Sequence, residues 1–310
     1  MVVPDPQAAE ALAERIGALR RQRRAVILAH NYQRPEVQDV ADIVGDSLAM
    51  AREAAKTDAQ TIVLCGVHFM AETAKLLNPD RPVLVPDPNA GCPMADMTAP
   101  RELAEAKRQH PEATVVAYVN SSARVKAMAD ICCTSANAVR VVESIPAEKP
   151  ILFVPDVSLG EYAAEVTGRE NIILWPGFCP THHHILAEHL QARRREHPDA
   201  EVLVHPECTR EVRHMADFIG STSQMLRHVR ESPKRTFIIG TEFGVCHTLR
   251  KENPEKEIIQ VSSLADCPDM KLTTLQKVTW SLEEMEHEVH VPKDVADDAR
   301  RAIERMLEVA

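Results

Sequence analysis

Short apolar runs recur along the chain, and each of them ends in polar residues. Three of these runs are almost evenly spaced: AVILAHNYQ at 25–33, ATVVAYVNS at 113–121 and EVLVHPECT at 201–209. Two more follow each of them: TIVLCG (61–66) and PVLVPD (82–87), ILFVPD (151–156) and NIILWP (171–176), TFIIGT (236–241) and EIIQVS (257–262). Short β-branched runs that alternate with helical stretches are typical of buried parallel strands. The pattern therefore predicts βαβ units with right-handed crossovers.

A longer phrase repeats with a period of 87 to 88 residues. It reads ADIVGDSLAM from Ala41, ADICCTSANA from Ala129 and ADFIGSTSQM from Ala216. The chain is therefore predicted to contain three homologous three-layer αβα sandwich domains with short parallel sheets, arranged about a pseudo-threefold axis. The expected division is an N-terminal helix at 1–24, α/β repeats at 25–110, 111–198 and 199–285, and a C-terminal helix at 286–310.

Polar residues with capping character lie inside each repeated phrase. The first helix of each unit is expected to end just before Asp46, Thr134 or Ser221, each a suitable N-cap for a second helix. The residue after each of these carries a hydroxyl group: Ser47, Ser135 or Thr222. Helix N-termini present free N–H groups and a partial positive charge, which suits phosphate or carboxylate. Any one of these residues could be only a cap, but three equivalent hydroxyls favour an anion-binding site.

Three of the eight cysteines keep the period of the units: Cys92, Cys179 and Cys267. Each follows the third apolar run of its unit and precedes a proline. Ligands of open α/β sheets bind at the carboxyl edge, so the three thiols are expected to meet near the axis. Structural zinc normally takes four ligands, whereas a 4Fe–4S cluster held by three cysteines would leave one iron open as a Lewis acid. The other cysteines are interpreted as small buried hydrophobic residues. Of the three consecutive histidines at 182–184, only His182 is expected to lie near the cluster.

The overall charge of the chain argues against some classes of binding partner. The chain has 36 Lys and Arg against 46 Asp and Glu, a formal charge of -10, which argues against nucleic acid or an anionic membrane. No apolar run approaches the roughly 18 residues of a membrane span, and the first residues lack the pattern of a secretory signal. A cytoplasmic location is therefore expected, where cysteines serve metals or reactivity more often than disulfides.

The span from about Ala25 to Leu282 resembles the quinolinate synthase family of NAD biosynthesis. The resemblance is carried by AHNYQRPEVQDVADIVGDSLAMA, CGVHFMAETAKLLNP, AYVNSSARVKAMADICCTSANA, HPECTREVRHMADFIGSTSQM, GTEFGVCHTLRKENP and the three cysteine loops. It implies three homologous domains around a 4Fe–4S cluster with three cysteine ligands and one open iron. It also implies the condensation of iminoaspartate with dihydroxyacetone phosphate to quinolinate, phosphate and water, with L-aspartate oxidase as a pathway partner.

The resemblance also implies roles for single residues. The cluster ligands would be Cys92, Cys179 and Cys267. The catalytic residues would be His30, Tyr32, Tyr118, His205 and Glu207. The residues that hold substrate would be His30, Ser47, Tyr118, Asn120, Ser135, His205, Glu207, Ser221 and Thr222. Some family members carry the third ligand in a CxxCxxC stretch, whereas Cys267 stands alone in ADCPDM, so no redox pair is expected there.

Two other functions remain open on the residues alone. An iron–sulfur electron carrier or redox sensor would use the same three thiols, but it would leave the hydroxyl caps and HPEC without a role. A cluster-free protein that binds or isomerises sugar phosphates would make the periodic cysteines incidental. Iron and sulfide analysis of anaerobically purified protein separates these possibilities.

Overall fold

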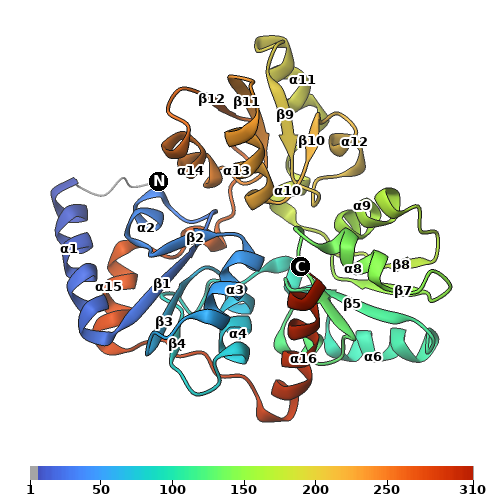
Figure 1. The fold of residues 1–310 in the computed structure, drawn as a ribbon, viewed down its shortest axis with the longest axis horizontal. Coiled ribbons are helices and arrows are strands. Elements are labelled where there is room, and N and C mark those ends of the chain that lie inside the picture. The colour runs from blue at the N-terminus through green and yellow to red at the C-terminus, as the bar shows by residue number, and fades with distance from the viewer. Residues whose placement is uncertain (1–5, 310) are drawn as a thin grey trace. The chain divides into compact units, whose positions relative to one another are not determined.

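The computed structural model describes residues 6–309, and it contains three parallel sheets of four strands with flanking helices (Figure 1). The chain divides into two compact units, one with residues 6–92 and 268–292 and the other with residues 93–267 and 293–309. We call them unit 1 and unit 2. The prediction of three αβα sandwiches with short parallel sheets is confirmed.

Unit 1 contains the first sheet. Its helices and strands are α1 (Pro6–Arg23), β1 (Ala25–His30), α2 (Pro35–Val40), β2 (Ile43–Gly45), α3 (Ser47–Lys56), β3 (Thr61–Cys65), α4 (His68–Leu77), β4 (Val83–Leu84), the 3-10 helix η1 (Asp269–Lys271) and α15 (Leu275–Glu284).

Unit 2 contains the second and third sheets. The elements of the second are α5 (Pro93–Asp96), α6 (Pro100–Gln109), β5 (Thr114–Tyr118), α7 (Ala123–Lys126), β6 (Ile131–Cys133), α8 (Ala138–Ser144), β7 (Ile151–Val154), α9 (Val157–Thr167) and β8 (Ile172–Leu174). Those of the third are α10 (Pro180–His183), α11 (Ala187–Glu196), β9 (Glu201–Val204), α12 (Arg210–Arg213), β10 (Phe218–Ile219), α13 (Thr222–Glu231), β11 (Thr236–Gly240), α14 (Val245–Glu252) and β12 (Glu257–Gln260). The last helix is α16 (Lys293–Val309).

All three sheets have the same strand order, β2-β1-β3-β4, β6-β5-β7-β8 and β10-β9-β11-β12. Every neighbouring pair is parallel. The central strands are buried along most of their length, as β3 and β7 show with every residue buried. Such burial on both faces explains their continuous apolar sequences. The carboxyl ends of the four strands of each sheet lie at one edge, where the polar residues of HNYQ, YVNS and HPEC follow.

The structure corrects the predicted length of the first helix in each repeat. The first helix of each repeat does not continue to the residue before Asp46, Thr134 or Ser221, because α2, α7 and α12 are only four to six residues long. The residues after them form the short edge strands β2, β6 and β10. Strands of two or three residues are too short to show an alternating pattern, which is why the sequence favoured a longer helix.

The aspartate of each repeated Ala-Asp pair explains why this phrase recurs. Three aspartates each accept a hydrogen bond from a backbone N–H of the first strand of their repeat, 15 residues earlier. The distances are 2.9 Å for Asp42, 2.8 Å for Asp130 and 2.8 Å for Asp217. Each also donates its own backbone N–H to the same residue of that strand. The edge strand begins directly after the aspartate. The carboxylate thus satisfies a donor that the short strand does not reach.

Two of the three predicted N-caps are confirmed. Asp46 accepts from Ala49 N at 3.0 Å, and Ser221 forms a capping box with Gln224 at the start of α13. Thr134 is not an N-cap, because α8 begins only at Ala138. Its hydroxyl instead accepts from Ala136 N at 3.2 Å, so the polar residues of this copy close a turn before the helix.

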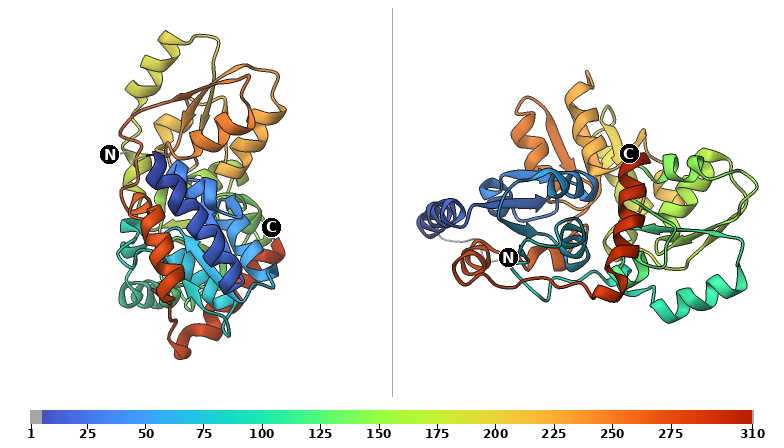
Figure 2. Two further views of the ribbon diagram at one scale, coloured as in Figure 1. Left: turned by 90° about the vertical axis from the view of Figure 1, so that its left-hand side faces the viewer. Right: turned by 60° about the horizontal axis from the view of Figure 1, so that its bottom comes forward.

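The helices at both ends of the described chain pack as expected. α1 lies beside α15 in unit 1, as Figure 2 shows. Arg23, in the basic run at its end, donates to the carbonyls of Leu282 and Glu283 at 3.0 and 2.6 Å and so caps α15. α16 contacts α7, β6 and α8 in unit 2. Of the helices in residues 6–309, none combines the length and apolar character that crossing a membrane requires.

The helix that follows each cysteine loop contacts an element of the next repeat. α6 contacts α7, and α11 contacts β11 and α12. α15, the corresponding helix of the third repeat, contacts β3 of the first sheet. This exchange explains why residues 268–292 belong to unit 1 and residues 93–110 to unit 2. The repeat boundaries given in the sequence analysis stay a prediction.

Candidate active site

Burial divides the eight cysteines into two groups. Cys92, Cys179 and Cys267 are partly exposed, and all eight are free thiols. The buried ones are Cys65, Cys132, Cys133, Cys208 and Cys246. Burial raises the pKa of Cys65 and of Cys132 to about 12, and it also raises the pKa of Cys133 and Cys208. A buried thiol that keeps its proton is a poor metal ligand. The three periodic cysteines are thus the ones whose thiols are not fully buried, and their role as cluster ligands stays a prediction.

Two of the cysteine loops begin with the same kind of turn. Asp87 Oδ1 accepts from Asn89 N at 2.9 Å, five residues before Cys92 in unit 1. Ser262 Oγ accepts from Leu264 N at 3.2 Å, five residues before Cys267 in unit 2. Such turns direct the chain away from the sheet edge. Cys92 and Cys267 are thus carried by loops that leave the carboxyl ends of β4 and β12, the fourth strands of their sheets.

Cys179 has an imidazole beside it. It occupies the N-cap position of α10, and His182 lies one turn further along that helix. The two side chains approach at 3.1 Å between Cys179 Sγ and His182 Nδ1. The other ring nitrogen of His182 lies 2.9 Å from Thr241 Oγ1, at the end of β11. His182 is 1% exposed, so this member of the HHH run belongs to the interior and not to the solvated surface.

Glu207 is the centre of a buried polar network in unit 2. Its Oε1 accepts from the Tyr118 hydroxyl at 2.5 Å, and its Oε2 lies 2.7 Å from His182 Nδ1. Burial by itself raises the pKa of Glu207, but the electrostatic effect of the His182 and His205 imidazoles and the hydrogen bonds from His182 and Tyr118 outweigh it. The pKa therefore lies well below its usual range, and the carboxylate is ionised.

His205 presents one ring nitrogen to a partner across the site. Its Nδ1 accepts from the backbone N–H of Glu207 at 3.3 Å, so the proton of the neutral ring is on Nε2. That Nε2 lies 3.2 Å from Ser135 Oγ, and the ring stacks on His182 with centroids 4.6 Å apart. Two repeats thus contribute to one constellation: Tyr118 and Ser135 from the second, His205 and Glu207 from the third.

The same local geometry recurs in unit 1. His30 Nδ1 accepts from the backbone N–H of Tyr32 at 3.1 Å, and the two rings meet edge to face at 4.5 Å. His30 is the last residue of β1, and His205 directly follows β9, so the two histidines occupy equivalent positions at the end of the first strand of their repeats. Lys271 donates to the carbonyl of Tyr32, which ties this loop to η1. Both histidines therefore direct a donor Nε2–H away from their own loop.

The remaining predicted residues lie at the starts of α3 and α13 and just after β5. Ser47 and Thr222 are the first residues of α3 and α13, and Ser221 is the cap before Thr222. In unit 2, Asn120 follows β5, and its buried Oδ1 has no hydrogen-bond partner. A buried amide oxygen without a donor is a natural contact for a ligand N–H or O–H.

A buried polar side chain supports each loop that follows a first strand, and the sequence analysis missed this set. The residues occupy the equivalent positions Gln38, Lys126 and Arg213. Each donates to the carbonyl five residues earlier: Gln38 to Gln33 at 2.8 Å, Lys126 to Ser121 at 2.6 Å and Arg213 to Cys208 at 2.8 Å. The signal was a polar residue that recurs three positions before the Ala-Asp pair.

Asp156 and Thr241 were also missed. They end the second strand-like runs of their repeats, where side chains reach the carboxyl edge. Asp156 is fully buried, and its Oδ2 has no hydrogen-bond partner. Burial, followed by the negative charge of Glu207, raises the pKa of Asp156 well above its usual value. The constellation in unit 2 thus contains more buried acidic groups than HPEC alone indicates.

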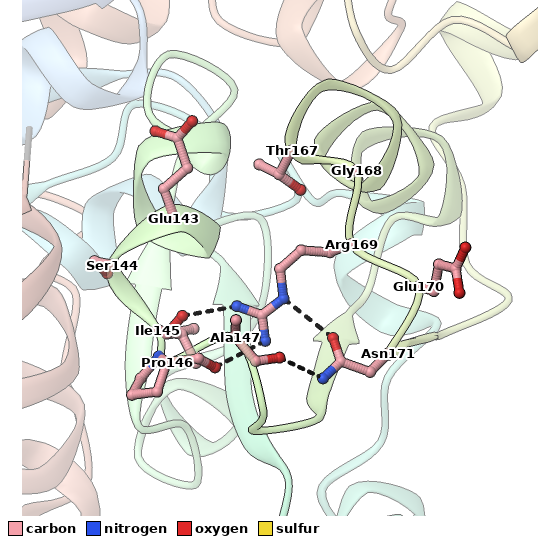
Figure 3. A pocket seen from close by; sticks show the side chains of 10 residues that line it. All are labelled: Glu143, Ser144, Ile145, Pro146, Ala147, Thr167, Gly168, Arg169, Glu170 and Asn171. Atoms are coloured by element: carbon pink, nitrogen blue, oxygen red, sulfur yellow. Dashed lines mark hydrogen bonds between the residues drawn. The ribbon is translucent and has the colours of Figure 1, made fainter.

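A hollow of about 680 Å³ lies elsewhere in unit 2, lined by residues 143–147 and 167–171 (Figure 3). These residues precede β7 and β8, so the hollow is at the amino ends of the strands. Its only arginine, Arg169, donates to the carbonyls of Ile145 at 2.7 Å and Pro146 at 3.1 Å, and to Asn171 Oδ1 at 3.1 Å. These bonds hold the loop after α8, so Arg169 has a structural role here.

Comparison with known proteins places this geometry in a family. The profile described as Quinolinate synthetase A protein (NadA) matches residues 14–308. A quinolinate synthase of Dehalococcoides mccartyi strain CBDB1 is 52% identical over 300 residues, which cover 97% of this chain and 99% of that protein. A quinolinate synthase of Thermus thermophilus is 52% identical over 305 residues, covering 97% and 98%. One of Methanosarcina barkeri is 52% identical over 298 residues, covering 96% and 97%.

Proposed function

Because the chain belongs to the Quinolinate synthetase A protein family, we propose that it is an enzyme that forms quinolinate for NAD biosynthesis. The proposed reaction condenses iminoaspartate with dihydroxyacetone phosphate and releases phosphate and water. The observation that carries the proposal is the buried Tyr118–Glu207–His182 network beside Cys179. An electron carrier would need no such set of proton-carrying side chains.

Three thiols are available for the cofactor. Cys92, Cys179 and Cys267 would hold a 4Fe–4S cluster, which supplies Lewis-acid polarisation of a substrate oxygen at its open iron. They are the partly exposed cysteines, and each follows the fourth strand of its sheet, β4, β8 or β12. This supports the assignment.

Glu207 is the proposed proton acceptor. The condensation needs a proton removed from a carbon of iminoaspartate, and Glu207 is buried and ionised. His182 Nδ1, 2.7 Å from Oε2, and the Tyr118 hydroxyl, which donates to Oε1, would keep the carboxylate oriented for proton uptake. The low pKa keeps Glu207 unprotonated until substrate arrives.

His205 and His30 are the proposed donors. In each ring a backbone N–H occupies Nδ1, so Nε2 carries the proton and can donate to a carbonyl or to a departing hydroxyl. Ser135 holds His205 Nε2 at 3.2 Å in the resting site. Tyr32 would keep the His30 ring in place through their edge contact.

The anionic groups of the substrates need donors. Ser47 and Thr222 lie in the first turn of α3 and α13, where N–H groups and the helix dipole favour phosphate or carboxylate. Ser221, Ser135 and Asn120 would add polar contacts at the same sheet edges. The expected pathway partner is L-aspartate oxidase, which would supply iminoaspartate, and the expected location is the cytoplasm.

The test is quinolinate formation by the anaerobically purified full chain, with iminoaspartate formed in situ from oxaloacetate and ammonia. Glu207→Gln keeps the shape of the side chain but cannot take a proton, so kcat should fall by about 100-fold or more. Glu211→Gln, four residues later and exposed, is the matched control and should keep full activity. A wild-type protein that retains its cluster and forms no quinolinate would refute the proposal.

A further inference from the structure

Among the described residues, one group of three side chains has the composition and spacing of a mononuclear metal site. It consists of Cys179, His182 and Glu207, whose potential ligand atoms all lie within 4.8 Å of one another. All three belong to unit 2. A thiolate, an imidazole and a carboxylate are the donors that zinc prefers, and three protein donors leave a fourth position for water.

We propose that the chain, when it holds no cluster, binds one divalent transition-metal ion of the zinc class through Cys179 Sγ, His182 Nδ1 and Glu207 Oε2. Because the ion uses Cys179, it and an iron–sulfur cluster exclude each other. Only the competition between the ion and the iron–sulfur cluster rests on the proposed function. The binding of the ion requires neither Cys92 nor Cys267.

The surroundings of the trio favour a bound ion. His182 Nε2 lies 2.9 Å from Thr241 Oγ1, which fixes the ring and leaves Nδ1 facing the other two donors. Glu207 uses its second oxygen, Oε1, to accept from Tyr118 at 2.5 Å. Partners of this kind, which hold the ligands from behind, are typical of metal sites and raise their affinity.

The distances need only a small adjustment. His182 Nδ1 lies 3.1 Å from Cys179 Sγ and 2.7 Å from Glu207 Oε2. An ion at roughly 2.0–2.3 Å from each donor, with tetrahedral angles, would separate these atoms by roughly 3.3–3.6 Å. His182 Nδ1 would therefore move away from each of the other two donors by roughly half an ångström, which side-chain rotation allows.

Charge also favours a cation at this position. Glu207 and Asp156 are both buried carboxyl groups, and they are close enough for the charge of one to act on the other. Asp156 Oδ2 has no hydrogen-bond partner. A divalent ion on Glu207 would compensate this acidic pair, which hydrogen bonds alone leave incompletely satisfied. Cys179, being partly exposed, gives the ion a route in.

The experiment is a titration of the cluster-free full chain with Co²⁺, whose thiolate charge-transfer absorption reports a cysteine ligand. We expect one equivalent to bind and Zn²⁺ to displace it. His182→Ala and Glu207→Gln should each weaken Co²⁺ binding by about tenfold or more, and Thr241→Val, which only removes a support, by about tenfold. Circular dichroism checks that each variant is folded.

The cysteine variants decide between two kinds of site. Cys92→Ser and Cys267→Ser should bind Co²⁺ as the wild type does, and Cys179→Ser should lose the charge-transfer band. If Cys92→Ser or Cys267→Ser also loses it, the three periodic thiols hold the ion and the proposal is wrong. Absence of binding to the wild type would also overturn it. These outcomes do not depend on quinolinate formation, so either proposal can fail alone.

Competition has its own readout. Zn²⁺ bound beforehand should slow the recovery of cluster absorption when iron and sulfide are added to the wild type. The same Zn²⁺ should have little effect on His182→Ala. Equal inhibition in both proteins would contradict the assigned ligands.

Discussion

Asp87 shows how one carboxylate can set the start of a functional loop. It is buried, accepts from Asn89 N at 2.9 Å through Oδ1 and pairs with Lys277 through Oδ2. Burial raises its pKa, but the hydrogen bonds from Lys277 and Asn89 and the charge of Lys277 outweigh this, so the pKa is lowered. The ionised group therefore joins the loop that leads to Cys92 to helix α15.

This shift predicts a pH-dependent contribution to stability. A carboxyl group whose folded pKa is below its unfolded value of about 3.9 stabilises fully above that value, and the contribution is lost as the pH falls through the folded pKa. Asp87→Asn should lower the free energy of unfolding by about 1–2 kcal/mol at pH 7, because one charged hydrogen bond is weakened beside a partly exposed lysine. Urea unfolding at pH 7, 5 and 3 measures it.

The exposed Asp80→Asn is the control and should change the free energy of unfolding by less than about 0.5 kcal/mol at any of these pH values. The loss in Asp87→Asn should shrink toward zero at pH 3. A loss that is equally large at pH 3 would mean that packing, not charge, explains it.

The loop after each first strand depends on one side chain from the short helix beneath it. Arg213 in α12 is 1% exposed and donates to the carbonyls of Cys208 at 2.8 Å and Ser158 at 3.0 Å. It also lies 3.3 Å from Glu165. Lys126 and Gln38 perform the corresponding function in the other two repeats, and Gln38 donates to the carbonyls of both Asn31 and Gln33 at 3.0 and 2.8 Å.

Removing this support should destabilise unit 2. Arg213→Met keeps the apolar stem but leaves two buried carbonyls without a donor, so the free energy of unfolding should fall by about 3 kcal/mol. Arg213→Lys should recover part of the loss, because a lysine serves the same position in the second repeat. Arg210→Met, whose ion pair with Glu165 is exposed, should cost less than about 1 kcal/mol. Denaturant unfolding distinguishes them, and a fully stable Arg213→Met would contradict the role.

Sequence patterns predicted the long elements better than the short ones. The β-branched runs at 25–33 and 61–66 contain β1 and β3, because buried parallel strands need continuous apolar sequence. The edge strand Ile131–Cys133 is not recognisable in the sequence, because three residues show no period, and the pattern predicts a helix there.

The same limit applies to the candidate site. Glu207 and His205 could be predicted because they follow a strand in a repeated motif. Thr241 and Asp156 lie at equivalent strand ends but differ in residue type between repeats, so the period alone did not reveal them. Their importance comes from contacts across repeats, which only packing shows.

At the scale of the whole molecule, three copies of one fold are linked by exchange of a helix. The helix after each cysteine loop contacts the following copy, and α15 of the third copy returns to the first sheet. Its buried residues Leu275, Val278 and Leu282 share one apolar core with Ile27 of β1 and Val63 of β3. The stability of the first sheet therefore depends on residues that lie more than 200 positions later in the chain.

A substitution in α15 should act on that distant sheet. Leu282 is fully buried, so Leu282→Ala should lower the free energy of unfolding of unit 1 by about 2–5 kcal/mol. Hydrogen exchange should then become faster in β1 and β3, because local opening reports the loss of packing. Exchange in β9 and β11, the sheet of the same sequence repeat, should stay as in the wild type. Glu284→Ala, exposed in the same helix, is the control. Faster exchange in β9 and β11 with none in β1 would show that α15 packs on its own repeat, and the exchange of helices between copies would be wrong.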